Sequence, residues 1–287
     1  MNPIIMDGAK LAGQIKERLA EIVETKERKP TLAIVTSGVD EASNVYVRNK
    51  VAAAKQCGIK TIVCSLREDM TTKDYAETVD RLDACSDVDG IIVQLPLPAH
   101  VDAKEVLSWI RPSKDVDGLT DDSVVARGTG VHHYLPCTPK GIMRLIDEYE
   151  IPVEGAHAVV VGRSELVGKP IAQMLLDRNA TVTVCHSKTQ NLKEITSTAD
   201  ILIVAVGSPE MIDASYIKPG AAVIDVGINR VWCRDSAGAE TGKKKTVGDV
   251  NLKDALTVAG HITPVPGGVG PMTVAMLMEN VVDAAYK

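Results

Sequence analysis

The chain has 287 residues, the length of two ordinary domains or one large one. Hydrophobic residues make up 45% and charged residues 24%, which excludes a disordered, collagenous or coiled-coil chain. The net charge is −6, only 3% of residues are aromatic, and Phe is absent. Because nucleic-acid binding needs basic surfaces and often exposed aromatic rings, these values argue against a nucleic-acid partner.

The cysteines and the chain ends indicate where the protein works. Six cysteines lie far apart without a Cys-x-x-Cys pair, which favours reduced thiols over disulfides or zinc. The first ten residues lack a signal-peptide pattern. Residues 255–278 are uncharged, but three prolines and four glycines interrupt them, so they do not predict a membrane span. We therefore expect a cytoplasmic protein without a membrane segment.

The first half of the chain predicts alternating helices and strands. A first helix, ending before Pro30, is predicted by aliphatic residues at helical spacing: Leu11, Ile15, Leu19 and Ile22. Strands are expected at 31–36, 61–65 and 88–95. Helices are expected at 43–58, with Ser43 as its N-terminal cap and Gly58 ending it, and at 73–85. This alternation predicts a parallel sheet with helices on both faces.

The second half begins after an expected loop-rich region at 111–136. Thr138, followed by Pro139, is expected to cap a helix at 140–149. A second α/β series and a closing helix follow, with strands at 157–161, 181–185, 201–206 and 221–226 and the helix at 273–286. The fold class is therefore α/β with two domains that meet near 138–152, and the strand order stays open.

A glycine-containing loop at 162–168 follows the strand at 157–161 and precedes a helix that begins at Lys169 and Pro170. Strand, glycine loop and helix form the context in which a helix N-terminus receives a pyrophosphate. Ser164 occupies the place of the second glycine, and the last glycine comes one residue late. The loop alone also fits a tight turn, but the surrounding α/β series favours a dinucleotide.

The end of the next strand indicates which dinucleotide is used. NAD sites place a carboxylate there, about 20 residues after the glycine loop. This strand ends instead in Cys185, His186, Ser187 and Lys188, and Arg163 lies in the glycine loop. Donors without an acidic group favour NADP over NAD. The alternative is an ordinary polar strand end.

Four further motifs point to a substrate site. Tyr46 and Lys50 share one helix face, and Gln94 ends a strand where open α/β sheets bind substrates. Asp117 lies in a turn at 114–118, and the loop at 264–271 is rich in Pro and Gly. Each has an ordinary explanation: an exposed helix face, a polar strand end, a solvated turn and an irregular connection.

Taken together and in order, the motifs resemble those of the bifunctional methylenetetrahydrofolate dehydrogenase/methenyltetrahydrofolate cyclohydrolase family. The matching segments span nearly the whole chain: Tyr46–Lys50, Val93–Pro98, Lys114–Gly118, Pro136–Gly141, Gly162–Gly168, Asp225–Asn229 and Pro264–Thr273. The stretch 232–245 matches nothing and is expected to be a variable surface loop. An appended formyltetrahydrofolate synthetase is not expected.

The resemblance implies two reactions and two domains. 5,10-Methylene-tetrahydrofolate is oxidised to the methenyl form with NADP and then hydrolysed to 10-formyl-tetrahydrofolate. Residues 1–138, completed by 271–287, are the expected folate-binding catalytic domain, onto which the final helix packs. Residues 139–270 are the expected Rossmann-like NADP domain. A homodimer formed through this second domain is also implied.

The resemblance also assigns roles to residues. Lys50 would handle protons, Gln94 would position it, Tyr46 would pack against folate, and Asp117 would accept two N–H groups of the pterin edge. Ser43 is a weaker candidate. Close approach to substrate is expected at Pro266, Gly267 and Gly268. The expected cofactor contacts are Gly162, Arg163, Ser164, Val167, Gly168, His186, Ser187 and Ile228. No metal is expected, and His132 and His133 are expected in a solvated loop.

Other functions remain as alternatives. A monofunctional or NAD-dependent dehydrogenase would share most motifs. A non-catalytic nucleotide-binding sensor would keep the glycine loop without needing the Tyr46, Lys50 and Asp117 set. Another Rossmann oxidoreductase, of the shikimate or amino-acid dehydrogenase kind, would lack the loop at 264–271.

Overall fold

The computed structural model describes residues 3–37, 41–128, 134–234 and 240–287. The chain divides into two compact units. The six-stranded unit comprises Met1–Leu11 and Thr138–Thr273, and the three-stranded unit comprises Ala12–Cys137 and Val274–Lys287. Both divisions near the chain ends fall inside helices, α1 (Gly8–Glu24) and α10 (Val269–Tyr286).

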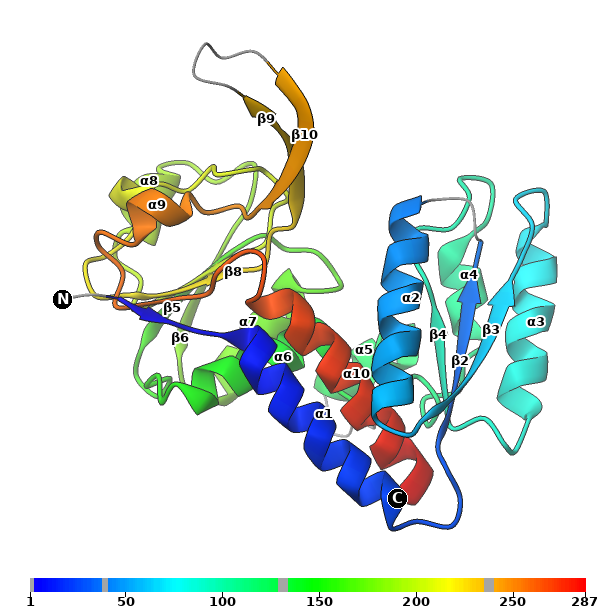
Figure 1. Ribbon diagram of the computed structural model, residues 1–287. Helices are drawn as coiled ribbons and strands as arrows, with labels where there is room; N and C mark the ends of the chain where they lie inside the picture. The colour runs from blue at the N-terminus through cyan, green and yellow to red at the C-terminus, as the bar shows by residue number, and fades with distance from the viewer. Residues whose placement is uncertain (1–2, 38–40, 129–133, 235–239) are drawn as a thin grey trace. The chain divides into compact units, whose positions relative to one another are not determined.

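The three-stranded unit has a parallel sheet in the order β3-β2-β4. Its strands are β2 (Thr31–Thr36), β3 (Lys60–Ser65) and β4 (Gly90–Val93). The central strand, β2, is buried at every position, as expected for an aliphatic strand with neighbours on both sides. Helices α2 (Glu41–Gln56) and α3 (Thr72–Ala84) lie on opposite faces of this sheet (Figure 1).

Local sequence explains most helix limits here. Thr71 and Asp74 form a reciprocal capping box at the start of α3. Gly58 has a φ of +72° and follows α2, as predicted. The prediction that Ser43 caps α2 is wrong, because the helix already begins at Glu41. Ser43 therefore lies within the first turn of α2.

One face of α1 was predicted almost correctly. Leu11, Ile15 and Leu19 are buried, but Ile22 is 40% exposed and Val23, at 1%, takes the fourth buried position. At 3.6 residues per turn, either residue fits the spacing after Leu19, and the sequence does not distinguish them.

The expected loop-rich region at 111–136 contains a helix that the sequence analysis missed, α5 (Asp121–Gly128). Its start has a local signal: the N–H of Ser123 donates to Oγ1 of Thr120 at 3.2 Å, and the first turn carries Asp121 and Asp122. A short helix α4 (Ala103–Ser108), capped by Asp102, precedes it.

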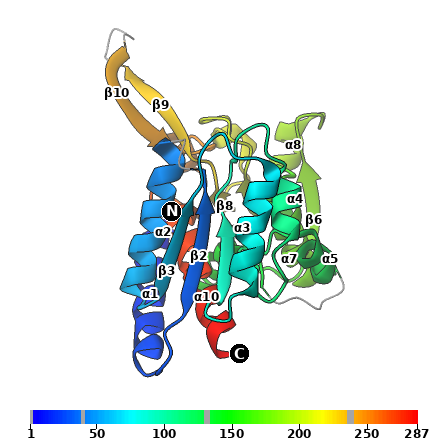
Figure 2. The ribbon, with the colours of Figure 1, turned by 90° about the vertical axis from the view of Figure 1, so that its right-hand side faces the viewer.

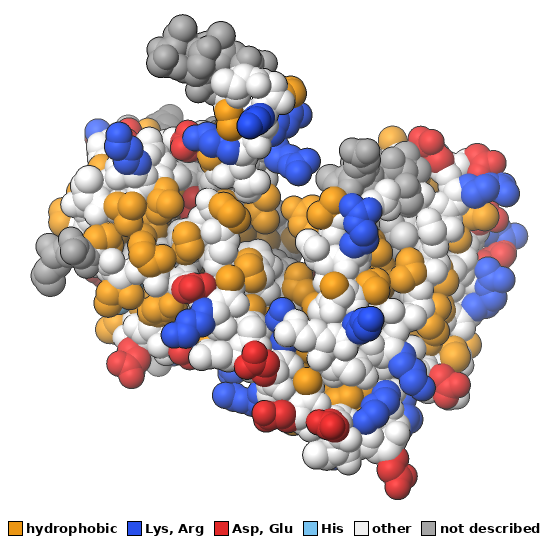
Figure 3. Space-filling model, viewed as in Figure 1, with side chains coloured by type: hydrophobic (Ala, Val, Ile, Leu, Met, Phe, Trp, Pro, Cys, Tyr) orange, Lys and Arg blue, Asp and Glu red, His pale blue; other side chains and the backbone are white. Residues whose placement is uncertain are grey.

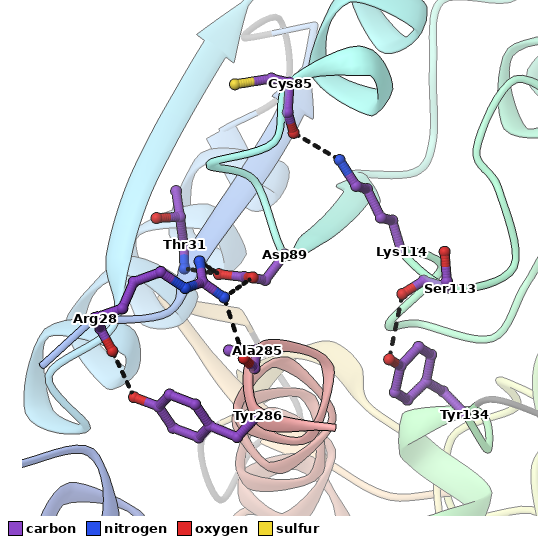
Figure 4. A network of polar contacts seen from close by, with 9 residues as sticks. All are labelled: Arg28, Thr31, Cys85, Asp89, Ser113, Lys114, Tyr134, Ala285 and Tyr286. Carbon is purple, nitrogen blue, oxygen red and sulfur yellow. Dashed lines mark hydrogen bonds and ion pairs between the residues drawn. The ribbon is translucent and has the colours of Figure 1, made fainter. Parts of the chain in front are cut away.

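A polar network fixes the start of β4 to the chain's last helix within the three-stranded unit (Figure 4). Asp89 accepts both terminal nitrogens of Arg28, at 3.0 and 2.5 Å, and the N–H of Thr31 at 2.8 Å. Arg28 also donates to the carbonyl of Ala285, and the Tyr286 hydroxyl donates to the carbonyl of Arg28. The expected packing of the final helix on the first domain is confirmed.

The six-stranded unit has a sheet in the order β1-β11-β8-β7-β5-β6, with every pairing parallel. The strands are β1 (Ile4–Ile5), β5 (His157–Val161), β6 (Thr181–Cys185), β7 (Ile201–Val204), β8 (Ala222–Asp225) and β11 (His261–Ile262). The connecting helices are α6 (Cys137–Glu148), α7 (Gly168–Asp177), α8 (Leu192–Thr196), α9 (Leu252–Ala255) and a 3-10 turn, η1 (Ala214–Tyr216). β5 is the point where the order reverses, since β6 and β7 lie on either side of it.

Two helix starts in this unit differ from prediction. Helix α6 begins at Cys137, so Thr138 is not its cap; instead its Oγ1 lies 2.9 Å from Oγ1 of Thr273. Helix α10 begins at Val269, four residues before the expected start at Thr273. Pro271 falls in its first turn, where proline is tolerated because the N–H has no helical partner.

The expected surface loop at 232–245 is wrong for the described residues of this stretch, because 232–234 and 240–245 belong to the antiparallel strands β9 (Asn229–Arg234) and β10 (Glu240–Val247), at the upper end of Figure 1. Register pairs Trp232 with Lys244, whose Nζ lies 4.3 Å from the ring centroid. Several Lys and Arg side chains gather on the described part of the hairpin in Figure 3. The three consecutive lysines at 243–245 favoured a loop over a strand. A strand of a two-stranded ribbon can also carry them, because both of its faces are exposed to solvent.

The remaining expectations concern membranes and cysteines. Among the described residues no helix combines the length and apolarity needed to cross a bilayer. All six cysteines are free thiols. Burial raises the pKa of Cys57 to about 11.

Candidate active site

Lys50 and Gln94 are brought together in the three-stranded unit. Lys50 lies on α2, and Gln94 follows β4, whose neighbour in the sheet is β2. The Lys50 Nζ donates to Oε1 of Gln94 at 2.9 Å. Gln94 is itself fixed, since its Nε2 donates to the Leu95 carbonyl at 2.8 Å and its backbone N–H to the Val35 carbonyl at 2.8 Å. Both side chains are half-buried, so the amine is held in place yet reachable.

Tyr46 lies one turn before Lys50 on the same helix, and 43% of it is exposed. Figure 2 shows α2 beside the edge of the three-stranded sheet. The backbone of Ser43 lies in the same helix, but its side chain is outside the described part. An exposed aromatic ring next to a held amine is the arrangement expected for a flat, partly apolar substrate.

The two aspartates of the turn at 114–118 have different environments. Asp115 is buried and accepts the N–H groups of Leu119 and Thr120 and the hydroxyl of Ser123, at 3.2, 2.9 and 2.7 Å. Asp117 is partly exposed. Asp115 therefore builds the loop, and the expected role of Asp117 in binding the pterin stays a prediction.

Neighbouring groups hold this turn rigidly. Lys114 Nζ donates to the carbonyls of Asp83 and Cys85 at 2.7 Å each, at the end of α3, and burial lowers the pKa of Lys114 (Figure 4). Gly118 has a φ of +66°, and a Cβ there would lie 3.0 Å from the Pro136 nitrogen. The turn that carries Asp117 is thus fixed on both sides.

The glycine loop of the six-stranded unit is shaped by close backbone contacts. Gly162 has a φ of +124°, and a Cβ on it would lie 2.2 Å from the carbonyl oxygen of Ala205. A Cβ on Gly168 would lie 2.3 Å from the carbonyl oxygen of Gly162. Ser164, in place of a glycine, accepts the N–H groups of Val167 and Gly168 at 3.3 and 3.4 Å. The loop therefore turns tightly into α7, and its expected contact with a pyrophosphate stays a prediction.

Arg163 follows β5 and Ser187 follows β6, so both residues lie beyond the carboxyl end of the sheet. Register pairs Val161 with Cys185, so the residues that follow both strands start from neighbouring positions. Arg163 and Ser187 are exposed. The Nδ1 of His186 accepts the N–H of Lys188 at 3.1 Å, which closes a turn around Ser187. No carboxylate follows β6 before Glu194, so the residues present fit a phosphate here better than a ribose diol.

The loop at 264–268 makes close contacts of its own. Val265–Pro266 is a cis peptide bond, and Gly267 has a φ of +106°. The Gly267 carbonyl accepts the N–H of Ala9 at 2.8 Å, and a Cβ on Gly8 would lie 2.0 Å from the carbonyl oxygen of Gly268. The described contacts of this loop are with the first turn of α1. Its expected contact with substrate stays a prediction.

Ile228 follows β8 and is 51% exposed, as a side chain that faces a ligand can be. Asp225 and Asp249 are both buried. The sequence did not predict this pair, although Asp225 is the first residue of the Asp225–Asn229 motif. Burial raises the pKa of Asp225, and the adjacent Asp249 carboxylate raises it further. Three backbone N–H donors lower it, and the resulting pKa is about 6.

Metal binding has no candidate in the part of the chain that the structure describes: no group of three or more His, Cys, Asp or Glu side chains is placed to hold an ion. His132 and His133 lie outside the described residues.

Known proteins match nearly the whole chain. Residues 6–117 match the catalytic domain of the tetrahydrofolate dehydrogenase/cyclohydrolase family, and residues 136–287 match its NAD(P)-binding domain. The chain belongs to this family. It is 48% identical over 283 residues to the bifunctional protein FolD of Agathobacter rectalis, with 98% of each chain covered. The family, the fold class and the pairing of dehydrogenase with cyclohydrolase activity predicted from sequence are confirmed.

Solved structures of other family members agree. The bifunctional FolD enzyme of Campylobacter jejuni has a TM-score of 0.91 at 42% identity, covering 98% of both chains. The Trypanosoma brucei dehydrogenase-cyclohydrolase, solved with NADP and an inhibitor, has a TM-score of 0.92 at 36% identity, covering 99% of this chain and 97% of that one.

Proposed function

We propose that this chain oxidises 5,10-methylene-tetrahydrofolate with NADP and hydrolyses the resulting methenyl-tetrahydrofolate to 10-formyl-tetrahydrofolate. The observation that carries the proposal is the Lys50–Gln94 hydrogen bond beside the exposed ring of Tyr46. It places an amine, which can donate and, when neutral, accept a proton, next to a surface suited to a planar substrate.

Gln94 sets the direction of the Lys50 amine. An amide flip would turn Gln94 Nε2 toward the Lys50 amine and Oε1 toward the Leu95 carbonyl, so the contact with that carbonyl selects the observed orientation. Only one of the three N–H directions of the Lys50 ammonium is taken up by Gln94. Among the described residues Gln94 is the one hydrogen-bond partner of this amine, so it can also donate to a folate nitrogen or, when neutral, accept a proton from an attacking water.

The two reactions require different contributions from the protein: positioning of the reactants in the first and proton transfer in the second. NADP, when bound, accepts the hydride of the first reaction. The methenyl cation is stabilised by its own two nitrogens, so the chain mainly has to hold the reactants in place. Ring opening needs proton transfer to and from water, which Lys50 supplies. Tyr46 covers one face of the folate and limits the access of bulk water.

Asp117 recognises the pterin. The aminopyrimidine edge presents two adjacent N–H donors, and one carboxylate accepts both in fork geometry. Asp115 cannot do this, because its oxygens already accept three donors inside the loop. The three-stranded unit is thus the folate-binding catalytic domain.

The six-stranded unit binds NADP. Gly162, Ser164, Val167 and Gly168 turn the chain so that the first turn of α7 faces the pyrophosphate. Arg163 and Ser187 bind the 2′-phosphate, supported by His186, and Ile228 contacts the nicotinamide half. The absence of an acid after β6 and the exposure of Arg163 and Ser187 support NADP over NAD.

One assay tests the function. Methylene-tetrahydrofolate is mixed with the protein and either NADP or NAD, and reduced cofactor is followed by absorbance. Methenyl-tetrahydrofolate is then supplied without cofactor and its disappearance is followed. We expect reduction of NADP, much slower reduction of NAD, and hydrolysis without cofactor. Reduction without hydrolysis would identify a monofunctional dehydrogenase, and binding without either reaction a sensor.

We further propose that the protein is a cytoplasmic homodimer formed through the six-stranded unit, without a nucleic-acid partner. The exposed Trp232 of the β9–β10 hairpin and the family membership support self-association. Sedimentation equilibrium should give twice the chain mass of 30.6 kDa. A monomer at micromolar concentration contradicts the dimer but leaves the enzymatic function untouched.

A further inference from the structure

Asp225 and Asp249 lie at the carboxyl end of the six-stranded sheet. Asp225 is the last residue of β8, and Asp249 comes two residues after β10. Their exposed fractions are 3% and 0%. Within the described residues neither takes part in an ion pair with Lys or Arg. Buried carboxylates without cations must be held by hydrogen bonds, so their partners show what they do.

Asp225 holds the backbone around Asp249. Its Oδ1 accepts the N–H groups of Gly227 and Asp249, and its Oδ2 accepts that of Val250, all at 2.9 Å. The contact is so close that a Cβ on Gly248 would lie 1.8 Å from Oδ2 of Asp225. Asp225 therefore fixes where the Asp249 side chain starts.

Asp249 in turn joins two other segments. Its Oδ2 accepts the N–H groups of Val206 and Gly207, at 2.7 and 2.9 Å, in the turn that follows β7. Its Oδ1 accepts Nδ2 of Asn229, at 2.8 Å, at the base of the β9–β10 hairpin. One carboxylate thus ties the turn after β7 to the segment after β8.

These two segments border the place where a dinucleotide binds. In open α/β sheets that place lies beyond the carboxyl ends of the strands where the order reverses, here between β5 and β7. The carbonyl of Ala205, which precedes Val206 and Gly207, lies so close to Gly162 of the glycine loop that a Cβ there would clash with it. Ile228, just before Asn229, is exposed. A shift of the turn after β7, or of the hairpin base at Asn229, would therefore change the shape of the expected dinucleotide site.

We propose that Asp249 is a positioning residue for hydride transfer, which holds the turn at 205–207 and the hairpin base so that the nicotinamide half of NADP is correctly placed. This inference rests on the proposed use of NADP. The adenine half, expected at Arg163 and Ser187 after β5 and β6, does not depend on Asp249, because none of the Asp249 contacts reaches those residues.

Two substitutions grade the effect. Asp249→Ala removes all three contacts. Asp249→Asn can keep its Oδ1 on the turn, while Asn229 rotates its own amide to accept the new Nδ2; its effect should be smaller. Asp200→Ala is the matched control: Asp200 precedes β7 at its opposite end, accepts the His157 N–H at 2.9 Å and pairs with Lys218.

The measurements separate positioning from general damage. For Asp249→Ala we expect dehydrogenase kcat to fall about tenfold or more, since small misplacements of reactants cost this much. NADP binding should weaken, whereas binding of adenosine 2′,5′-bisphosphate, measured by titration, should stay at the wild-type value. Hydrolysis of added methenyl-tetrahydrofolate should also stay unchanged. Asp200→Ala should leave every one of these values within about twofold.

The proposal is overturned if Asp249→Ala keeps wild-type dehydrogenase activity, or if it loses bisphosphate binding and hydrolysis in parallel. If Asp249→Ala does not fold, Asn229→Ala tests the proposal instead, because it removes only the contact at the hairpin base. We then expect the dehydrogenase to slow a few-fold while bisphosphate binding stays at the wild-type value. A wild-type protein that does not reduce NADP refutes the proposed function itself, before any variant is compared.

Discussion

The two units present their ligand-binding groups in different ways. In the three-stranded unit the candidate groups are side chains: a half-buried amine held by one amide, an exposed ring and a partly exposed carboxylate. In the six-stranded unit the surface expected to face the pyrophosphate is backbone, exposed side chains such as Arg163 are expected only at the ends of the cofactor, and the Asp249 side chain is buried.

This difference matches the chemistry. Proton transfer and recognition of a pterin edge need specific side-chain atoms, whereas a pyrophosphate is held by N–H groups that every residue possesses. Substitutions should therefore change individual reaction steps in the three-stranded unit and the geometry of binding in the six-stranded unit. Four predictions test this contrast.

The largest effect is expected at Lys50. Lys50→Met keeps the aliphatic stem and removes the amine, so hydrolysis of methenyl-tetrahydrofolate should fall by a factor on the order of 100 or more. The dehydrogenase should fall less, and methenyl-tetrahydrofolate should accumulate during turnover. Near-normal hydrolysis of added methenyl-tetrahydrofolate would contradict the role of Lys50, while the family assignment would stand.

Asp117 should come next. Asp117→Ala removes two charge-assisted hydrogen bonds to the pterin and should weaken folate binding by about 10- to 100-fold in both half-reactions. NADP binding to the free enzyme should not change. Isothermal titration with folate measures the effect directly, and wild-type affinity would exclude the fork.

The neighbouring aspartate provides the control for this prediction. Asp115→Ala should reduce the free energy of unfolding, by about 3 kcal/mol, because it leaves buried donors without an acceptor. Urea unfolding distinguishes the two: Asp117→Ala should be as stable as the wild type.

A smaller and more selective effect is expected at Arg163. Arg163→Ala should raise the Michaelis constant for NADP roughly tenfold, the value of one charge-assisted contact, and hardly affect that for NAD. Equal weakening for both cofactors would show that Arg163 does not bind the 2′-phosphate.

The last prediction concerns stability at pH values below 7. The folded pKa of Asp225, about 6, lies above its ordinary value of 3.8, so the folded state binds the proton more tightly than the unfolded state. The resulting stabilisation is complete below about pH 4 and is lost as the pH rises toward 6, with a slope of at most about 1.4 kcal/mol per pH unit. Wild-type stability should therefore fall relative to Asp225→Asn across this window, as measured by urea unfolding. Parallel pH profiles would contradict the raised pKa.

Aliphatic patterning predicted the buried strands well. β2 and β5 have the residue limits expected from sequence, because buried strands are continuous aliphatic runs. The limits of β6, an edge strand in which Thr and Val alternate, were also predicted. The hairpin of β9 and β10 was missed, since its exposed residues follow no hydrophobic alternation. Strand order was not predictable, because it depends on contacts between segments that are far apart in sequence.

One contact of the candidate site was predictable from sequence, while the roles of its residues stay predictions. Lys50 and Gln94 were paired through the resemblance, and the structure places them 2.9 Å apart. Asp249 was not found, because its partners come from three separate loops and its local sequence, Gly-Asp-Val, indicates nothing by itself. Only the folded chain shows that three sets of donors converge on this carboxylate.

The pairing of both chain ends with distant partners has a consequence for how the protein is made. Strand β1 pairs with β11, more than 250 residues later, and Asn280 of α10 donates to the carbonyls of Val116 and Leu135, at 2.8 and 3.0 Å. A ribosome releases the last segment of each unit only after nearly all of these 287 residues have been synthesised. Contacts of such long sequence separation form slowly, so the newly made chain exposes unfinished sheet edges and helix faces for longer than a protein built from contiguous domains.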